Sequence, residues 1–373
     1  MGASASPKIS VAMCTNNLEI NGISSVIMNY CCKINLNRFN LTIIAGSPVA
    51  SVYRMKCKEL GIRLYECPNR KTSNIAYYSF LNKILSTNKF DIFHVHCNSA
   101  TVTIELFLAW LHGIKIRIAH SHSTSCNHIK INKLLMPAFQ RLYTHGLACG
   151  KAAGQWLFGD SPFDILPNGF QTKNFIFSPE SRDKIRRETH TTENLVLGHI
   201  GRFNHQKNQS FLLEVFRSIG AKRKDAVLLL VGTGPDLDHI KSLVEIHPYK
   251  ERIILYGETT SPAAIYAAMD VFLFPSKAEG LGIVALEAQI SGLPCIVSKA
   301  VPKDVVLGDN IEFLPIDNAN LWANRITSIT IETENRKDFY NINREHILKY
   351  DIAENVSLLE NIYTNLYRKI EDI

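Results

Sequence analysis

The sequence lacks the features that define several whole classes of protein. No apolar run reaches the ~20 residues that a membrane-spanning helix needs. The first residues do not place an apolar segment after a basic one, as a secretory signal does. The nine cysteines form no C-x-x-C pair and follow no regular spacing, which argues against a disulfide framework or a zinc site. We therefore expect a cytoplasmic protein with reduced thiols.

Dense basic runs with interleaved aromatic residues are also missing, so we expect no nucleic-acid partner. Charge is nevertheless uneven along the chain. Residues 1–172 hold 17 Lys and Arg against 7 Asp and Glu, whereas residues 173–373 hold 24 against 27. A basic first half favours an anionic partner, such as phosphate groups or an anionic membrane surface.

Short β-branched runs alternate with helical patterns along most of the chain, which predicts α/β domains with parallel sheets. The length of 373 residues suits two such domains. The predicted strands cover residues 8–13, 40–46, 62–67, 91–96, 114–120, 145–150, 194–203, 226–235, 252–257, 270–276, 293–298 and 311–316.

The alternation stops at residues 164–183, a segment rich in Pro, Asn, Gly and Ser that is typical of a turn and linker. We therefore predict one domain over residues 1–172 and a second over 173–351. The amphipathic tail, 352–373, is predicted to be helical and to pack back on the first domain. Because open α/β sheets bind ligands beyond the carboxyl ends of their strands, both sheets are expected to face a central cleft.

Three predicted strands of the second domain end in glycine-bearing turns that open helices, GRFNHQKN, GTGPDLDH and SKAEGLGIVALEA. Glycine lets a backbone approach a ligand closely, and the N–H groups at a helix start attract phosphate. In the first turn Gly201 is followed by Arg202 and Lys207, two cations that suit a diphosphate. Surface ion pairs are the alternative for these two side chains. Asp236 and Asp238 of the second turn are predicted to cap a helix rather than to bind a metal.

Two glutamates of the third turn, Glu279 and Glu287, lie eight positions apart, and a helix is predicted to begin near residue 282 between them. Eight residues at helical rise span about 12 Å, roughly the distance between the sugar of a nucleotide-sugar and its ribose. A carboxylate accepts hydrogen bonds from adjacent hydroxyls, so one acid is suited to the sugar and the other to the ribose. The alternative is that Glu279 only complements the helix dipole and that Glu287 is an exposed helix position. The mostly apolar neighbours of Glu287 argue against that alternative.

In these motifs the sequence resembles family 4 of the retaining glycosyltransferases, which have the GT-B fold of two Rossmann-like domains. It is most similar to the branch that makes capsules and exopolysaccharides. The resemblance runs along almost the whole chain. It is carried by EGLGIVALEAQISGLPCIVS, which matches the family's Glu-x7-Glu signature, by GHIGRFNHQKNQSFLLEVF, by the domain-junction turn ILPNGF, and by the histidine-bearing strands DIFHVH and IAHSHS.

The resemblance implies a role for each charged residue of the second domain. Glu279 corresponds to the family's glutamate that contacts the donor sugar, and Glu287 to the one that contacts the ribose. Arg202 and Lys207 correspond to the cations that clamp the diphosphate, next to the turn glycine Gly201.

Backbone groups complete the implied donor site. The amides that follow the first glutamate of the signature correspond to Gly280, Leu281 and Gly282. In its first domain the family usually has a glycine pair near the phosphates. Here NGIS keeps Gly22 but has Asn21 in place of the other glycine.

Histidines mark two strands of the first domain. His120 ends a predicted strand at the cleft edge and corresponds to the family's histidine near the acceptor and the donor sugar, with His122 as the alternative. His96 and His122 are predicted to contact the acceptor, whereas His94 is expected to be a core histidine. Metal binding is another interpretation of these histidines, but no carboxylate or cysteine completes a plausible ligand set, so we expect no metal. The predicted catalytic residues are His120, Glu279, Arg202 and Lys207.

The sequence therefore predicts a retaining, metal-independent hexosyltransferase-type glycosyltransferase that uses a nucleotide-sugar, a UDP-sugar in our interpretation, and requires no cofactor. The predicted acceptor is a saccharide on a lipid pyrophosphate, reached through peripheral contact with an anionic membrane at the inner face of the cell membrane. Two alternatives stay open, a nucleotide-sugar epimerase on the same architecture and a non-catalytic nucleotide-sugar-binding partner protein. A dinucleotide-dependent dehydrogenase is disfavoured because no strand is followed by a full G-x-G-x-x-G.

Overall fold

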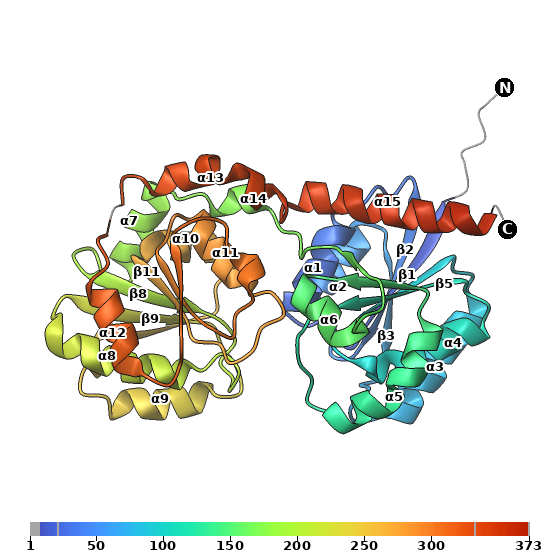
Figure 1. Cartoon of the computed structure of the whole chain (residues 1–373), viewed down its shortest axis with the longest axis horizontal. Coiled ribbons are helices and arrows are strands. Elements are labelled where there is room, and N and C mark those ends of the chain that lie inside the picture. The colour runs from blue at the N-terminus through green and yellow to red at the C-terminus, as the bar shows by residue number, and fades with distance from the viewer. Residues whose placement is uncertain (1–7, 21, 332, 372–373) are drawn as a thin grey trace. The chain divides into compact units, whose positions relative to one another are not determined.

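The computed structural model describes residues 8–20, 22–331 and 333–371, and the chain divides into two compact units (Figure 1). The first unit contains the chain up to Phe170 and resumes at Lys349, and the second runs from Gln171 to Leu348. The boundaries predicted from the sequence, after residues 172 and 351, lie within a few residues of these two crossings.

The first unit is built on a seven-stranded sheet in which every neighbouring pair is parallel, in the order β3-β2-β1-β4-β5-β6-β7. Nearly every residue of β1 and β4 is buried, as expected for parallel strands covered by helices on both faces. The strands are β1 (Ile9–Thr15), β2 (Phe39–Gly46), β3 (Arg63–Cys67), β4 (Ile92–Cys97), β5 (Ile116–Ser121), β6 (His145–Ala148) and β7 (Asp164–Ile165).

Helices cover both faces of this sheet, and Figure 1 shows α3, α4 and α5 together on one side. The last helix, α15, contacts α1 and buries Tyr363 edge-on against Phe39 of β2, with ring centroids 5.8 Å apart. The tail is therefore helical and part of the first unit. The helices are α1 (Gly22–Cys31), α2 (Ser51–Glu59), α3 (Asn74–Thr87), α4 (Thr103–Leu111), α5 (Ile129–Leu142), α6 (Lys151–Phe158) and α15 (Ile352–Glu371).

The second unit repeats the same plan with a six-stranded parallel sheet in the order β10-β9-β8-β11-β12-β13. Its core joins residues of the central strands, such as Leu197 and Leu230, to the helix residues Phe216 and Trp322. The strands are β8 (Leu195–Ile200), β9 (Ala226–Val231), β10 (Ile253–Gly257), β11 (Val271–Phe274), β12 (Cys295–Ser298) and β13 (Ile311–Leu314).

The helices of the second unit also form two layers, with α8, α9 and α12 on one side of the sheet and α7, α10 and α11 on the other (Figure 1). The helices are α7 (Pro179–Glu188), α8 (Gln209–Lys222), α9 (Leu237–Glu245), α10 (Pro262–Ala268), α11 (Ile283–Ile290), α12 (Ala319–Thr327), α13 (Phe339–Ile342) and α14 (Arg344–Leu348).

The predicted fold class of two parallel α/β sheets is confirmed. Every predicted strand is present, with ends that differ by at most four residues, because the strands that precede glycine turns end before the glycine. Strand β7 was missed because it has only two residues, both exposed, inside the segment predicted to be a linker. Among the described residues, no helix combines the length and apolar character that crossing a bilayer requires.

Candidate functional site

The loops that follow β8, β9 and β11 leave the same edge of the second sheet. These strands are parallel neighbours in the order β9-β8-β11, so their carboxyl ends lie together. The order of strands reverses between β8 and β11, and such a switch point is where open α/β sheets form a ligand-binding crevice. All the second-domain residues predicted from the sequence lie on these loops or on the helix that follows β11.

The β8 and β9 loops touch through their backbones. Phe203 donates its N–H to the carbonyl oxygen of Thr233 at 2.8 Å. Gly232 has a φ of +131°, and a Cβ atom built on it would lie 2.2 Å from the carbonyl oxygen of Gly201. Because only glycine permits both the backbone angle and this approach, the GTG motif is needed to hold the two loops together.

Lys207 and Glu279 form an ion pair between the β8 loop and the β11 loop. The Lys207 Nζ lies 2.6 Å from Glu279 Oε1, and Ser276 donates its hydroxyl to the same oxygen at 2.5 Å. The Lys207 Nζ also lies 4.8 Å from the ring centroid of Phe274. Side-chain exposures of 18% and 9% leave the pair only weakly screened by solvent. The residues predicted to bind a diphosphate and a sugar therefore contact each other in this structure.

Arg202 and the glycine loop lie at the same edge. Arg202 is exposed, and its carbonyl oxygen accepts a hydrogen bond from Gln209 Nε2 at 3.0 Å, which anchors the loop beneath it. Gly282 has a φ of +90° and is the N-cap of α11. Leu281 is buried, so its side chain packs inward. The predicted contribution of Gly280, Leu281 and Gly282 is through their backbones, and this placement is compatible with it.

Glu287 lies in the second turn of α11 and is half-buried. The Tyr266 hydroxyl, from α10, donates a hydrogen bond to Glu287 Oε2 at 2.8 Å. Burial raises the pKa of Glu287 to about 7, and the hydrogen bond from Tyr266 acts in the opposite direction. The carboxyl group is therefore neither the exposed helix position of the alternative interpretation nor a fully paired core group.

Four histidines form a buried cluster at the carboxyl ends of β4 and β5 in the first unit, namely His94, His96, His120 and His122. His94 Nε2 lies 3.2 Å from His120 Nδ1, and His96 Nδ1 lies 2.9 Å from His122 Nε2. Burial lowers the pKa of all four rings below the usual histidine range, to about 4 for His122. All four imidazoles are therefore neutral near pH 7.

The cluster brings the three predicted histidines together but leaves none of them exposed. The His120 side chain is fully buried on β5, one residue before the strand ends. His122 follows the strand, and its ring nitrogens contact His96 and, at 3.1 Å, Asn168 Oδ1. His94, predicted to be a core histidine, has both ring nitrogens hydrogen-bonded. The predicted contacts of His120, His122 and His96 with substrate stay predictions.

Three of these rings offer nitrogens close enough to be considered as metal ligands. One ring nitrogen each from His94, His96 and His120 lies within 4.8 Å of the other two. The His94 and His96 rings, however, are stacked, with centroids 4.4 Å apart and an interplanar angle of 19°. A nitrogen lone pair lies in the plane of its ring, so near-parallel rings do not converge on one ion as a tetrahedral site requires. The cluster does not fit a metal.

Gly22, the predicted glycine of the first domain, begins α1 after β1. It is exposed, and a Cβ atom built on it would meet no heavy atom within 4 Å. Asn21 lies outside the described residues. The β1 loop leaves the sheet beside β4, at the switch point of the first sheet, so its position suits a phosphate but its role stays a prediction.

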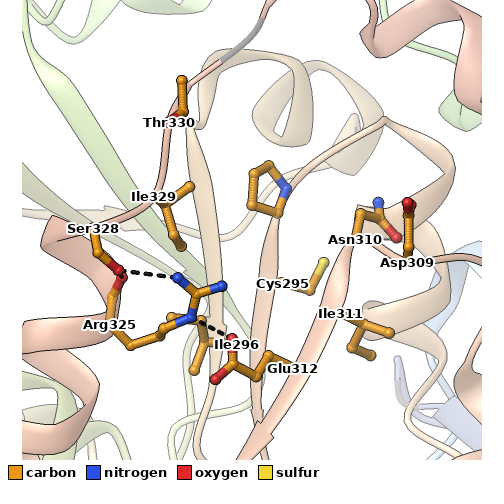
Figure 2. A pocket seen from close by; sticks show the side chains of 11 residues that line it. Cys295, Ile296, Asp309, Asn310, Ile311, Glu312, Arg325, Ser328, Ile329 and Thr330 are labelled. Carbon is orange, nitrogen blue, oxygen red and sulfur yellow. Dashed lines mark hydrogen bonds and ion pairs between the residues drawn. The ribbon is translucent and has the colours of Figure 1, made fainter.

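A pocket of about 480 Å³ lies elsewhere in the second unit, between β12 and β13 (Figure 2). Arg325 crosses it to pair with Glu312 and donates to Ser328 Oγ at 2.9 Å. Cys295 and Ile311, which begin the two strands, also line it. The pocket is therefore at the amino ends of the strands, at the opposite edge of the sheet from Glu279, and it is not the predicted donor site.

Sequence reasoning missed the residues that hold the predicted ones in place. Ser276 donates a hydrogen bond to Glu279, and Tyr266 donates one to Glu287. The spacing of these two residues in the sequence does not distinguish them from other serines and tyrosines. One prediction was wrong. Asp236 occupies the N-cap position of α9, but its side chain forms no capping hydrogen bond, and its φ of −93° and ψ of 5° lie outside the extended region that is usual for a capping residue.

The environment of Glu287 predicts how stability depends on pH. An unfolded chain loses this proton near pH 4.5, whereas the native state keeps it until about pH 7. The native state therefore binds more protons in this window, and its stability falls as pH rises from 5 to 8. Glu287→Gln lacks this titrating group, so its stability should not fall in the same way. Between pH 5 and 8 we expect the melting temperature of the variant to rise by about 2–4 °C relative to that of the wild type, the shift that about 1 kcal/mol of unfolding free energy produces. Scanning calorimetry at several pH values measures it, and melting curves that shift in parallel for both proteins would contradict the assignment.

Comparisons with known proteins identify the family and the fold. Residues 181–346 match the family described as glycosyl transferases group 1. The chain is 28% identical over 364 residues to the putative glycosyltransferase EpsF of Bacillus subtilis (strain 168), covering 93% of this chain and 94% of that protein. It is 24% identical over 303 residues to an Escherichia coli UDP-Gal:alpha-D-GlcNAc-diphosphoundecaprenol alpha-1,3-galactosyltransferase, covering 77% and 78%.

Solved structures show the same fold. The crystal structure of Anabaena Alr3699/HepE in complex with UDP and glucose superimposes with a TM-score of 0.80 at 16% identity, over 95% of this chain and 99% of that one. WaaG, a glycosyltransferase involved in lipopolysaccharide biosynthesis, does so with a TM-score of 0.70 at 16% identity, over 95% and 99%. Residues 181–346 therefore belong to the group 1 glycosyl transferases, and the chain is a glycosyltransferase of the GT-B fold in a retaining family that needs no metal ion.

Proposed function

We propose that this glycosyltransferase moves a sugar from a UDP-sugar to a hydroxyl group of a lipid-linked saccharide during capsule or exopolysaccharide synthesis. The observation that carries the proposal is the Lys207–Glu279 pair at the carboxyl edge of β8 and β11, with Arg202 on the same loop as Lys207. A cation and an acid at one switch point suit a ligand that is anionic at one end and rich in hydroxyls at the other.

The diphosphate of the donor binds to the cations. Arg202 and Lys207 donate charge-assisted hydrogen bonds to phosphate oxygens, which are roughly twice as strong as neutral ones. Lys207 is already held in place by Glu279 and the Phe274 ring. Binding therefore costs less side-chain entropy than it would with a mobile lysine. The amides of Gly280 and Gly282, next to the start of α11, add the positive end of a helix dipole.

The two carboxylates bind the ends of the donor. Glu279 accepts hydrogen bonds from hydroxyls of the transferred sugar, and Glu287 accepts them from the ribose diol. Ser276 keeps one oxygen of Glu279 oriented, and Tyr266 does the same for Glu287. Each acid thus has one oxygen that a protein hydroxyl group orients.

The transfer step is a displacement at the anomeric carbon with retained configuration. The bond from that carbon to the diphosphate oxygen breaks as a bond to the acceptor oxygen forms on the same face. The acceptor proton passes to the departing phosphate oxygen, and UDP leaves. Arg202 and Lys207 stabilise the charge that develops on UDP, and His120 is assigned to the vicinity of the sugar.

The proposed acceptor follows from the relatives. The Escherichia coli relative is named for an acceptor sugar on diphosphoundecaprenol, and another Escherichia coli relative, 24% identical, is an O-antigen biosynthesis glycosyltransferase named WclY. Such acceptors are anchored in a membrane, so the enzyme must work at its surface. We place this chain in the cytoplasm, with peripheral contact at the inner face of the cell membrane.

One face of the first unit supports that membrane contact. Helices α3, α4 and α5 are neighbours and carry a set of exposed apolar side chains, which we call the α3–α5 face. Its members are Ile75, Phe80, Ile104, Phe107, Trp110, Leu111, Ile129, Ile131 and Leu134. Apolar side chains rimmed by basic ones are typical of helices that lie in the plane of a membrane surface.

The charged side chains on the same face are basic. Lys130, Lys133 and Arg141 of α5 are exposed. Between residues 92 and 159 the only acidic residue is Glu105, and it is buried with Arg70 Nε 3.2 Å from its Oε1. This long stretch therefore presents no exposed carboxylate to an anionic lipid surface, and each basic residue near such a surface contributes about 1 kcal/mol.

Replacing Arg202 tests the diphosphate contact. Arg202→Ala should weaken UDP binding by about tenfold or more, because a charge-assisted hydrogen bond is lost. Isothermal titration calorimetry with UDP measures the change. The matched control is Arg223→Ala, since Arg223 is an exposed arginine of the same unit near the start of β9 and pairs with Asp225. Equal affinity of the Arg202 variant and wild type for UDP would rule out the assignment.

Replacing Glu279 separates sugar contact from nucleotide contact. Glu279→Gln should lower transfer by about 100-fold or more, a loss typical of a group that stabilises the transition state. UDP binding should stay the same or tighten, because Lys207 loses its anionic partner. UDP release from a panel of UDP-sugars, with diphosphate-lipid-linked N-acetylglucosamine as acceptor, measures transfer. Epimerised donor without transfer would point to the epimerase alternative, and full transfer by the variant would refute the role of Glu279.

Vesicle flotation tests the membrane contact. At low salt the wild type should bind vesicles that contain phosphatidylglycerol but not neutral vesicles. The double variant Trp110→Ser/Leu134→Ser should reduce partitioning at least about tenfold, since each large apolar side chain contributes roughly 1.5–3 kcal/mol when fully buried. Ile246→Ser is the control, because Ile246 is about as exposed as Leu134 but lies in the second unit. A wild type that stays entirely unbound would end the membrane proposal while leaving the transfer proposal intact.

A further inference from the structure

A buried histidine of the second unit, His199 in β8, lies against the turn that carries Arg202. The His199 side chain has no exposed surface. Its ring stacks with those of Phe272 and Phe274 of β11, at centroid distances of 6.4 and 6.2 Å. A Cβ atom built on Gly201 would lie only 3.0 Å from His199 Nε2, so the ring is packed closely against the backbone of the turn.

The contacts of His199 are compatible with only one tautomer of its ring. The Nδ1 atom lies 2.9 Å from the carbonyl oxygen of Leu273, which can only accept a hydrogen bond, so Nδ1 carries the proton. The Nε2 atom lies 3.2 Å from the side-chain nitrogen of Gln209, which can only donate, so Nε2 accepts. Burial lowers the pKa of the ring to about 4, and a neutral ring with one donor and one acceptor satisfies both contacts.

Gln209 joins this ring to the main chain of Arg202. Gln209 is the first residue of α8 and is buried. Its Nε2 donates one hydrogen to His199 Nε2 and the other to the carbonyl oxygen of Arg202 at 3.0 Å. Turning the amide around would bring its oxygen against two acceptors, so both contacts require the same orientation. From the Leu273 carbonyl through His199 and Gln209 to Arg202, each donor therefore meets an acceptor.

The main chain on either side of Arg202 is held as well. Gly201 and Phe203 donate their N–H groups to carbonyl oxygens of β9 and of the loop that follows it, at 3.0 and 2.8 Å. Because Gln209 binds the Arg202 carbonyl oxygen, the peptide group between Arg202 and Phe203 is held at both of its polar atoms. The Arg202 side chain is exposed, so its main chain sets the direction in which it leaves the turn.

We infer that His199 and Gln209 are positioning residues for the proposed diphosphate site. The His199 ring orients the Gln209 amide, and the amide fixes the main chain from which Arg202 projects. The inference rests on the proposed role of Arg202 in binding the diphosphate. A cation whose backbone is fixed before the ligand arrives loses less conformational entropy on binding. Both positioning side chains are buried and are assigned no contact with UDP, so their effect on its affinity must pass through Arg202.

A double-mutant cycle on the full chain tests whether Gln209 acts through Arg202. Gln209→Met keeps the approximate size of the side chain but removes both N–H groups of the amide. We expect it to lower UDP affinity about fivefold or more in the wild type, but by no more than about twofold in Arg202→Ala. Isothermal titration calorimetry with UDP measures both steps. A purely structural role would give equal losses in the two backgrounds, and equal losses, or none in the wild type, would overturn the inference.

Two substitutions of His199 separate its two contacts. An asparagine nitrogen can replace Nδ1 as the donor to Leu273, whereas a glutamine oxygen can replace Nε2 as the acceptor for Gln209. His199→Gln should therefore keep UDP affinity within about twofold, and His199→Asn should lose about fivefold or more. The control is His247→Gln, because His247 is also buried, with Nε2 3.0 Å from a backbone carbonyl oxygen, but precedes β10 at the amino ends of the strands. It should leave UDP affinity unchanged, and the opposite ranking of the two His199 variants would contradict the inference.

The tautomer of His199 provides a measurement that does not depend on UDP. Long-range ¹H–¹⁵N NMR of histidine side chains distinguishes a protonated from a bare ring nitrogen, and the His199 signals are those lost in either His199 variant. We expect a protonated Nδ1 and a bare Nε2 in the wild type. A protonated Nε2 would overturn the inference, because it could not accept from Gln209. If the wild type binds no UDP, the proposed donor site fails, whereas the NMR result still decides whether His199 orients Gln209.

Discussion

The ion pair between Lys207 and Glu279 is the contact on which the proposed donor site of this glycosyltransferase depends. It joins two loops that are 72 residues apart in sequence, and it places opposite charges at one edge of the second sheet. Both side chains are largely withdrawn from water, so the loss of either would leave the other charge partly buried and unpaired. The pair therefore keeps both groups in position in the absence of a ligand, and the Ser276 hydroxyl fixes the carboxylate further.

The sheet topology makes this contact geometrically attainable. In the order β9-β8-β11, strands that are distant in sequence end side by side, and their loops meet at the switch point. The glycines of the β9 loop allow its backbone to pack against the carbonyl oxygen of Gly201. This contact holds the β8 loop in place. Gly282 in turn ends the β11 loop in a left-handed conformation and starts α11, and this sets the direction in which Glu287 projects. Backbone packing thus determines where the charged groups lie.

The two units carry different chemistry at equivalent edges. In the second unit the strand ends carry charged side chains, whereas in the first unit β4 and β5 end in four neutral histidines. Neutral imidazoles suit hydroxyl groups, and charged side chains suit phosphates. Exposed basic residues such as Lys130, Lys133 and Arg141 lie instead on the outer helix α5, beside exposed apolar residues. This division agrees with a nucleotide diphosphate on one unit and a saccharide on the other.

The sequence by itself determined the order of strands and helices, because buried parallel strands need continuous apolar runs and the turns between them need glycine, asparagine or proline. It also predicted that Glu279, Glu287, Arg202 and Lys207 bind the donor, because they lie beside glycine turns at strand ends, and this stays a prediction. Only the tertiary structure decided which of these groups pair with each other. Lys207 meets Glu279, Tyr266 holds Glu287, and Tyr363 reaches His94 from 269 residues away. The physical reason is that sequence patterns report local geometry and burial, whereas hydrogen bonds and ion pairs between distant segments depend on how the strands are ordered in the sheet.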